Sequence, residues 1–233
     1  MKNFFFAFLL LFPTLMISQV NQTRFWVGAG ADDNWTTSGN WSTASGGGSS
    51  NDYPSGSAAI AKFESSNLTV TVDTNITLKQ LIETGAAPAA AKYTISASGG
   101  STLTLMGWQN NAQVIQINKN SGGFKFASGS KLIVNSVDAA HNTILRTNNG
   151  LAVLSFLDGS TLEILSKNAI FNTANSNANT YLKGIVVAGA DSDIMWYGNT
   201  KVWFGTTIDT TNFLGEINGG NTANGSVATV QGT

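Results

Sequence analysis

Few residues in the chain have the types and spacing that catalysis or metal binding requires. His141 is the single histidine and there is no cysteine, so the chain offers neither a Cys–His pair for nucleophilic catalysis nor a Cys/His zinc site. No glycine-rich segment has the spacing of a phosphate-binding loop between a strand and a helix. We therefore predict no catalytic residue, no metal and no cofactor, and we expect His141 on a surface turn before Thr143.

Carboxylates form the second group of candidates. Asp191 and Asp193 are two positions apart, which places both on one face of a strand, and Asp32 is adjacent to Asp33. Pairs of carboxylate oxygens are ligands that Ca²⁺ accepts, but neither pair lies in a loop with the usual number of ligands. Aspartate also favours turns because it bonds to nearby backbone groups. Calcium binding by Asp191 and Asp193 is left open by the sequence.

Three large side chains near the end of the chain form the third group. Met195, Tyr197 and Trp203 occupy positions where the earlier copies of a repeat carry Ser, Lys and Glu. We predict that they form an exposed patch that contacts a ligand, because a contiguous apolar patch marks a contact surface. Three interpretations stay open: cover by the chain's own tail through Phe213 and Leu214, contact with a following domain or another surface protein, and a sugar platform.

The repeat that positions these residues is a strand, a tight turn and a second strand. Apolar residues alternate in both strands, which predicts one buried face, and Gly or Asn at the turn predicts a positive φ. Copies of the pattern begin at Val70, Ile95, Phe124, Leu154 and Ile194. The predicted turn residues are Asn75, Gly100, Gly129, Gly159 and Asn199. The last interval is longer, and we predict an Asn-rich loop over residues 171–180.

One such unit cannot bury its apolar face alone, whereas stacked copies bury each other. The repeat therefore predicts an all-β fold: a right-handed parallel β-helix of about five or six coils. Further candidate strands at 114–117, 143–146 and 182–187 are expected to form its third sheet. The predicted division is a signal peptide at 1–19, a cap region at 20–66, the β-helix at 67–218 and a low-complexity tail at 219–233.

The N-terminal segment and the low charge predict an exported protein. Lys2 followed by an apolar run from Phe4 to Phe12 indicates a secretory signal, too short to span a bilayer. Charged residues make up 11% of the chain and the net charge is −1, so we expect no nucleic-acid partner. We also expect no membrane span after signal removal, and we predict a secreted or cell-surface location.

Three tryptophans within sixteen residues distinguish the segment before the repeats. Trp26, Trp35 and Trp41 fit a cap over the first coil, whose apolar end and strand edges would otherwise be exposed. A sugar-stacking platform is the alternative.

The tryptophans, with Val70-Thr71-Val72-Asp73 and the Gly-Ser turns, resemble the start of autotransporter-associated β-strand repeat proteins over residues 24–204. The resemblance implies a passenger-type, right-handed parallel β-helix on a bacterial surface, often adhesive. It carries no catalytic residues to transfer.

Together these observations predict a non-enzymatic, secreted or cell-surface β-helical stalk or adhesin segment. We expect it to be the N-terminal part of a larger surface protein. A carbohydrate-binding module is the alternative, with polysaccharide as the partner, as is a β-helical polysaccharide lyase or hydrolase.

Overall fold

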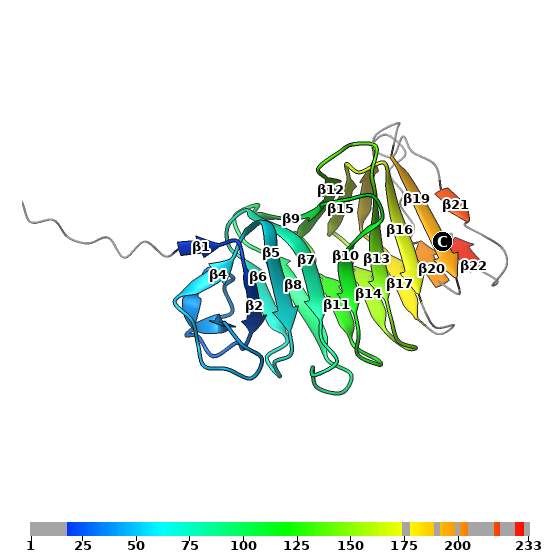
Figure 1. Ribbon diagram of the computed structural model, residues 1–233. Coiled ribbons are helices and arrows are strands. Elements are labelled where there is room, and N and C mark those ends of the chain that lie inside the picture. The colour runs from blue at the N-terminus through cyan, green and yellow to red at the C-terminus, as the bar shows by residue number, and fades with distance from the viewer. Residues whose placement is uncertain are drawn as a thin grey trace, which may run out of the picture.

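The computed structural model describes residues 18–173, 178–188, 192–198, 201–204, 217–219 and 227–230. Side chains are described within residues 21–172, 178–188 and 192–196. Residues 1–17 of the predicted signal, Asp191, Phe213 and Leu214 lie outside the described residues. The regular secondary structure of the described residues is almost entirely β-strand. The strands stack as a parallel β-solenoid, which confirms the predicted fold class (Figure 1). The one helical element that it contains is a 3₁₀ turn, η1 (Ser38–Asn40).

The solenoid has three faces, and each turn of the chain contributes a strand to each. The first face is a seven-stranded sheet. Its strands are β6 (Thr69–Val72), β8 (Lys92–Ala97), β11 (Gly123–Phe126), β14 (Val153–Phe156), β17 (Asn179–Leu182), β20 (Lys201–Phe204) and β22 (Val227–Val230). The second face holds β9 (Thr102–Gly107), β12 (Lys131–Ser136), β15 (Thr161–Ile164) and β18 (Ile185–Ala188). The third holds β10 (Ala112–Ile117), β13 (Asn142–Thr147), β16 (Asn168–Thr173), β19 (Asp193–Gly198) and β21 (Ile217–Gly219).

The second and third faces join at a single long strand, β7 (Ile76–Glu83). Its first half pairs with β9 and its second half pairs with β10, so the two faces share one 13-stranded sheet. Within the described residues, four turns have a strand on all three faces: β8 to β10, β11 to β13, β14 to β16 and β17 to β19. The predicted number of five or six coils is therefore not confirmed, and handedness stays a prediction.

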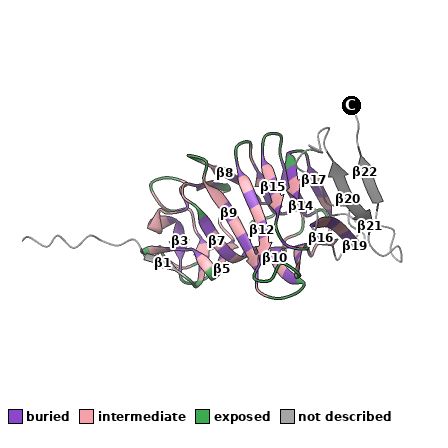
Figure 2. Ribbon diagram, turned by 90° about the horizontal axis from the view of Figure 1, so that it is seen from above, coloured by how far each residue is buried: buried purple, intermediate pink, exposed green. Residues whose placement is uncertain are grey.

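Alternating burial in the strands shows why the chain folds this way (Figure 2). In β12 and β15 every second residue is buried, as in Leu132, Val134, Leu162 and Ile164. Phe126 and Phe156, from successive turns, stack inside with ring centroids 4.8 Å apart. The inward positions predicted for the copies that begin at 95, 124 and 154 are thus confirmed, except that Ala97 is only partly buried; the predicted outward position Ser155 is also buried, at 5% exposed. This core holds the solenoid together without a disulfide.

The region predicted as a separate cap continues the sheet instead of standing apart from it. Strand β5 (Gly56–Phe63) pairs in parallel with β7, and β2 (Thr23–Trp26) pairs in parallel with β5. β3 (Trp41–Ser42) runs antiparallel to β2. β1 (Ser18–Val20), which contains the predicted cleavage site, pairs with β4 (Asp52–Pro54). A capping role for the tryptophans stays a prediction.

The last predicted copy of the repeat is wrong in register. The segment that starts at Ile194 begins in β19 on the third face and ends in β20 on the first face, whereas the earlier copies run from the first face to the second. The true continuation of β14 and β15 is β17 and β18, joined at Lys183 and Gly184. The strand predicted over 182–187 is therefore divided by a corner. The corner between the first and second faces and the corner between the third and first faces share one local sequence pattern. Alternation of apolar residues therefore cannot distinguish them.

Two further predictions about connections are corrected. The segment 171–180 is not one long loop, because β16 extends to Thr173 and β17 begins at Asn179. The tail predicted after residue 218 contains β22, which pairs with β20.

Gly100, Gly129 and Gly159 have φ values of 76°, 79° and 78°, as predicted for the turns. Asn75 does not have a positive φ, and Asn199 lies outside the described residues.

Candidate functional site

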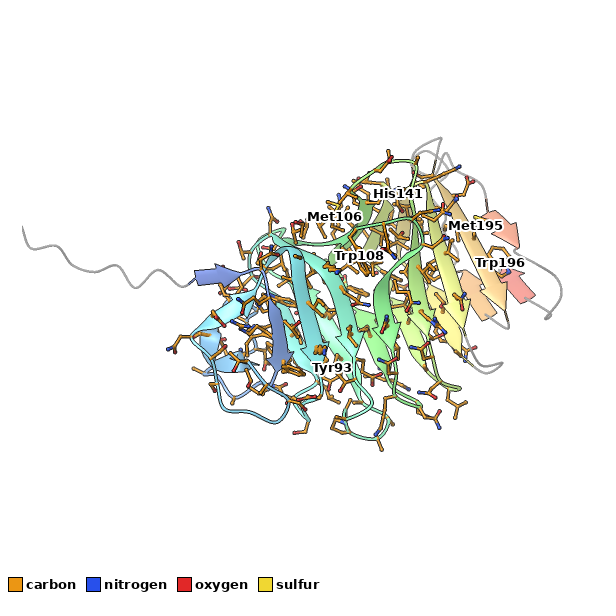
Figure 3. The ribbon with its side chains drawn as sticks, viewed as in Figure 1. Tyr93, Met106, Trp108, His141, Met195 and Trp196 are labelled. Atoms are coloured by element: carbon orange, nitrogen blue, oxygen red, sulfur yellow. The ribbon has the colours of Figure 1, made fainter. Side chains whose placement is uncertain are left out.

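The three residues predicted to contact a ligand lie on two faces. Met195 and Tyr197 belong to β19 on the third face, while Trp203 belongs to β20 on the first. The cross-strand neighbour of Trp203 is Tyr181, and that of Tyr197 is Asn172. Met195 is partly exposed (Figure 3), and the side chains of Tyr197 and Trp203 lie outside the described ones. The structure therefore keeps Met195 and Tyr197 on one face and places Trp203 elsewhere.

The tryptophan cluster at the N-terminal end is sealed inside the protein. Trp26, Trp35 and Trp41 are fully buried. Each indole nitrogen donates to a backbone carbonyl: Trp26 to Asn67 at 3.2 Å, Trp35 to Pro54 at 3.0 Å, and Trp41 to Trp35 at 2.7 Å. A sugar cannot stack on rings that have no exposed face, so the interpretation of this cluster as a sugar platform is wrong.

A continuous row of outward positions crosses seven strands of the third face and its N-terminal extension. We call these seven residues the outer row. Its members are successive cross-strand partners: Phe25, Lys62, Ile82, Gln116, Arg146, Asn172 and Tyr197. The first six are partly exposed, and the first five of them lie between buried neighbours along their strands. The strands that carry them lie side by side along the molecule in Figure 1. Six strand steps of about 4.8 Å give the row a length of about 29 Å.

Arg146 is the residue of this row with unmet bonding capacity. Its cross-strand neighbours are the amides Gln116 and Asn172. Gln116 donates to Gln113 at 2.7 Å. Nε of Arg146 is shut off from solvent and has no hydrogen-bond partner, and no described carboxylate forms an ion pair with the guanidinium. Buried polar groups normally have partners, so an unpaired guanidinium is notable.

An aliphatic row runs beside the outer row on the same face. Ile144, Ile170 and Met195 are successive cross-strand partners, two positions before Arg146, Asn172 and Tyr197 in their strands. Ile170 is 3% exposed although its position faces outward, so its strand neighbours crowd it closely. The third face thus combines a polar strip with an adjoining apolar one.

A ladder of polar side chains, made of two amides and Asp193, occupies the first position of the same strands. Asn142, Asn168 and Asp193 are cross-strand partners. The side-chain amide of Asn168 lies 2.7 Å from Oδ1 of Asn142, and it lies 3.3 Å from Oδ2 of Asp193 when its nitrogen faces that carboxylate. Stacked amides of this kind stabilise neighbouring turns of a solenoid. The ladder gives Asp193 a partner within the chain, and calcium binding together with Asp191, which lies outside the described residues, stays open.

The other predicted acids and the histidine have local roles. Asp32 accepts from the Asn34 backbone at 3.0 Å and from Thr37 Oγ1 at 2.6 Å. These bonds, that from Thr37 first, hold the pKa of Asp32 below its usual value. His141 lies between β12 and β13 (Figure 3), with Nε2 3.8 Å from Oδ2 of Asp138. Among the described residues no three His, Cys, Asp or Glu side chains gather as metal ligands.

Glu83 is a buried carboxyl that sequence reasoning did not single out. It ends β7 and is fully buried. One oxygen accepts from the Lys119 backbone at 3.1 Å, and the other, Oε1, is buried without a partner. Burial raises the pKa of Glu83 to about 7. A Cβ at Gly122 would lie 1.9 Å from Oε1, so the turn closes tightly over the carboxyl. In this position Glu83 is closed off from solvent.

An open cleft of about 280 Å³ lies beside the glycine-rich hairpin at the N-terminal end, lined by Val27, Gly46, Gly47, Glu64 and Ser65, above the buried Trp26. Its charged group is Glu64, which accepts from the Ser45 hydroxyl at 3.0 Å and from the Gly46 backbone at 2.8 Å. This carboxylate fastens the hairpin, and the cleft is a weaker candidate than the outer row.

Comparisons of the chain with protein-family models, with curated proteins and with solved structures find no match. The resemblance to autotransporter-associated repeat proteins thus stays a prediction. No helix in the described part of the chain has the length and hydropathy to cross a membrane.

Proposed function

We propose that the protein is a non-enzymatic β-solenoid segment of a secreted or cell-surface protein, acting as a stalk or adhesin and forming the N-terminal part of a larger surface protein. The observation that supports this role is the outer row itself. Parallel strands in continuous register hold side chains at fixed intervals along a rigid body. Such a surface suits the display of repeated contacts to an extended partner.

The interior supports the same role. Its volume is filled by aliphatic and aromatic side chains, of which Phe126, Phe156 and Phe171 are fully buried. Close packing of this kind gives a stiff rod, since interiors at this density resist deformation. The apolar leader expected at 1–19 supports export.

Labelling of intact cells tests the proposed location. An antibody to the solenoid should stain cells of the source organism, or their culture medium, before permeabilisation. Externally added protease should remove the signal from intact cells. Staining that appears only after permeabilisation, with no antigen in the medium, would contradict an extracellular role.

A carbohydrate-binding module is the second candidate, and the amides around Arg146 favour it. Amide side chains offer both donors and acceptors, as neighbouring sugar hydroxyls require. Binding and release of reducing ends, measured on one set of polysaccharides, separate the candidates. Binding without cleavage supports a module or adhesin, whereas cleavage supports the alternative of a lyase or hydrolase.

A further inference from the structure

We propose that the outer row is a binding strip for an acidic polysaccharide, whose carboxylates pair with Arg146 and Lys62. The inference rests on the extracellular role proposed above, because that is where the row would meet glycans. It also names the partner that an adhesin of this shape would hold.

The charge argument starts from the two arginines of the chain. Arg24 is matched by Asp52, whose two oxygens lie 2.5 and 2.6 Å from Nε and Nη2. Arg146 has the same planar set of donors, yet no carboxylate of the described residues reaches it. A guanidinium presents donors in a fork that fits a carboxylate at two points. Because Nε of Arg146 is closed off from solvent while the residue is partly exposed, the two Nη groups are the donors that a carboxylate from outside the chain can reach.

Lys62 supplies a second cation in the same row. Its ammonium lies 5.1 Å from the centre of the Phe25 ring, and it forms no ion pair with a described carboxylate. Three strand steps separate Lys62 from Arg146, which corresponds to about 14 Å. Two cations at this distance along a strip fit an extended polymer with repeated charges better than a single small anion.

Of the nearby described acids, Glu64 keeps its charge close to Lys62, whereas Glu83 and Asp193 lie away from Arg146. Glu64, two residues after Lys62, accepts from the Ser45 hydroxyl and the Gly46 backbone. Glu83 is buried under the turn that follows β10. Asp193 is four residues before the outer-row position in β19, about 13 Å along the strand, beside the Asn168 amide. No acid belongs to the outer row itself, and within the described residues no ion pair neutralises Arg146 or Lys62.

The remaining contacts suit sugar rings. Gln116 and Asn172 flank Arg146 and can bond to hydroxyls on either side of an acidic group. In the aliphatic row that borders the strip, Ile144 and Met195 are partly exposed and offer an apolar surface to the C–H faces of the rings, whereas Ile170 between them is buried. Polar groups beside an apolar surface are the combination found in ligand sites.

The experiment compares polygalacturonate with the same polymer fully methyl-esterified, which lacks the charge, using the full chain and isothermal titration. We expect the acid form to bind and the ester to bind at least about tenfold more weakly, since a charged hydrogen-bonded pair is lost. Arg146→Gln should weaken binding of the acid form by about tenfold, and Arg146→Lys by less, because lysine keeps the charge but not the fork. Lys62→Gln should weaken it by a smaller factor.

The matched control is Lys125→Gln, which removes a cation from β11 on the first face. It should change the affinity by less than about twofold, since exposed charges act weakly at a distance. Urea unfolding of every variant checks that the fold is intact. Equal losses for Lys125→Gln and Arg146→Gln would overturn the proposal, because binding would then follow net charge only.

Other outcomes are equally decisive. Equal affinity for the acid and the ester would remove the role of charge. No binding to polygalacturonate, alginate or heparin would overturn the strip itself. Binding of a single-stranded oligonucleotide with the same dependence on Arg146 would replace the glycan by any polyanion. A surface location established by cell labelling would survive each of these results, so the two proposals fail separately.

Discussion

The N-terminal end of the solenoid and its third face use the same kinds of side chain in opposite ways. At the N-terminal end, Arg24 meets Asp52 and each of the three indole nitrogens meets a carbonyl. On the third face, Arg146 has Nε shielded from water and no partner within the described chain. The first region satisfies its polar groups internally and therefore serves stability. The second leaves bonding capacity unused, which is typical of a surface that binds something else.

The largest expected effect concerns the interior that both regions share. Phe156→Ala should lower the free energy of unfolding by about 3–5 kcal/mol, because a fully buried ring stacked on Phe126 is replaced by a cavity. Ser155→Ala, at the adjacent position, which is 5% exposed but holds only a small side chain, should cost about 1 kcal/mol or less. Urea titration of both variants measures the difference. Equal losses would mean that the assigned facing of β14 is wrong.

Arg24→Gln should be the next most damaging change, at about 2–4 kcal/mol. The substitution leaves the Asp52 carboxylate without its charged partner in a partly buried site. The hydrogen bonds from Arg24 hold the pKa of Asp52 below its usual value, which shows that the pair interacts in the folded protein. Asp52→Asn and the double variant complete a double-mutant cycle, which gives the coupling free energy between Arg24 and Asp52. A coupling free energy near zero would show that the pair contributes nothing, and the contrast with Arg146 would then lose its meaning.

Glu83 gives a pH dependence with a defined sign. Its pKa is about 7 in the folded protein against an ordinary 4.5, so the native state holds the proton more tightly than the unfolded state. The carboxyl is neutral in both states below about pH 4.5, and its destabilising effect grows until about pH 7. The stability gained by Glu83→Gln should therefore be larger at pH 8 than at pH 5 by about 2–3 kcal/mol.

Urea unfolding at the two pH values measures this change, with Glu163→Gln as the control. Glu163 lies on the surface and is paired with Lys131 at 2.7 Å. The account of Glu83 is contradicted if its variant and the control respond to pH alike.

The smallest expected effect is the one that most sharpens the comparison. Arg146→Gln should change the free energy of unfolding by less than about 0.5 kcal/mol, because no internal partner is lost. Thermal unfolding of Arg146→Gln and Arg24→Gln under the same conditions measures the two losses of stability. A loss at Arg146 as large as that at Arg24 would assign Arg146 to the structure instead of to a ligand.

Much of the fold could be predicted because alternation is a local property. The buried positions of β12 and β15 follow from period two, and the turn at Gly129 follows from its residue type. Which corner of the solenoid a turn forms is not local, and so the segment after Ile194 was assigned to the wrong pair of faces. The predicted number of coils, which depended on that assignment, is not confirmed.

The candidate site was harder to predict, since it depends on register between segments about thirty residues apart. Nothing near Arg146 in the sequence shows that Gln116 and Asn172 flank it. Tyr197 was found because aromatics are conspicuous, whereas Lys62 and Arg146 look like ordinary surface charges. An available signal was that each lies one position before the last residue of its strand and is followed by a buried residue.

The two arginines allow one direct measurement of the central claim. Because the chain contains only Arg24 and Arg146, an ¹⁵N correlation spectrum of the Nε–Hε groups resolves one signal for each. Arg146→Gln assigns them. On addition of polygalacturonate, we expect the Arg146 signal to move saturably and the Arg24 signal to stay in place, with no movement of either on addition of the methyl ester. A stationary Arg146 signal at saturating polymer, or equal movement of both signals, would contradict the account.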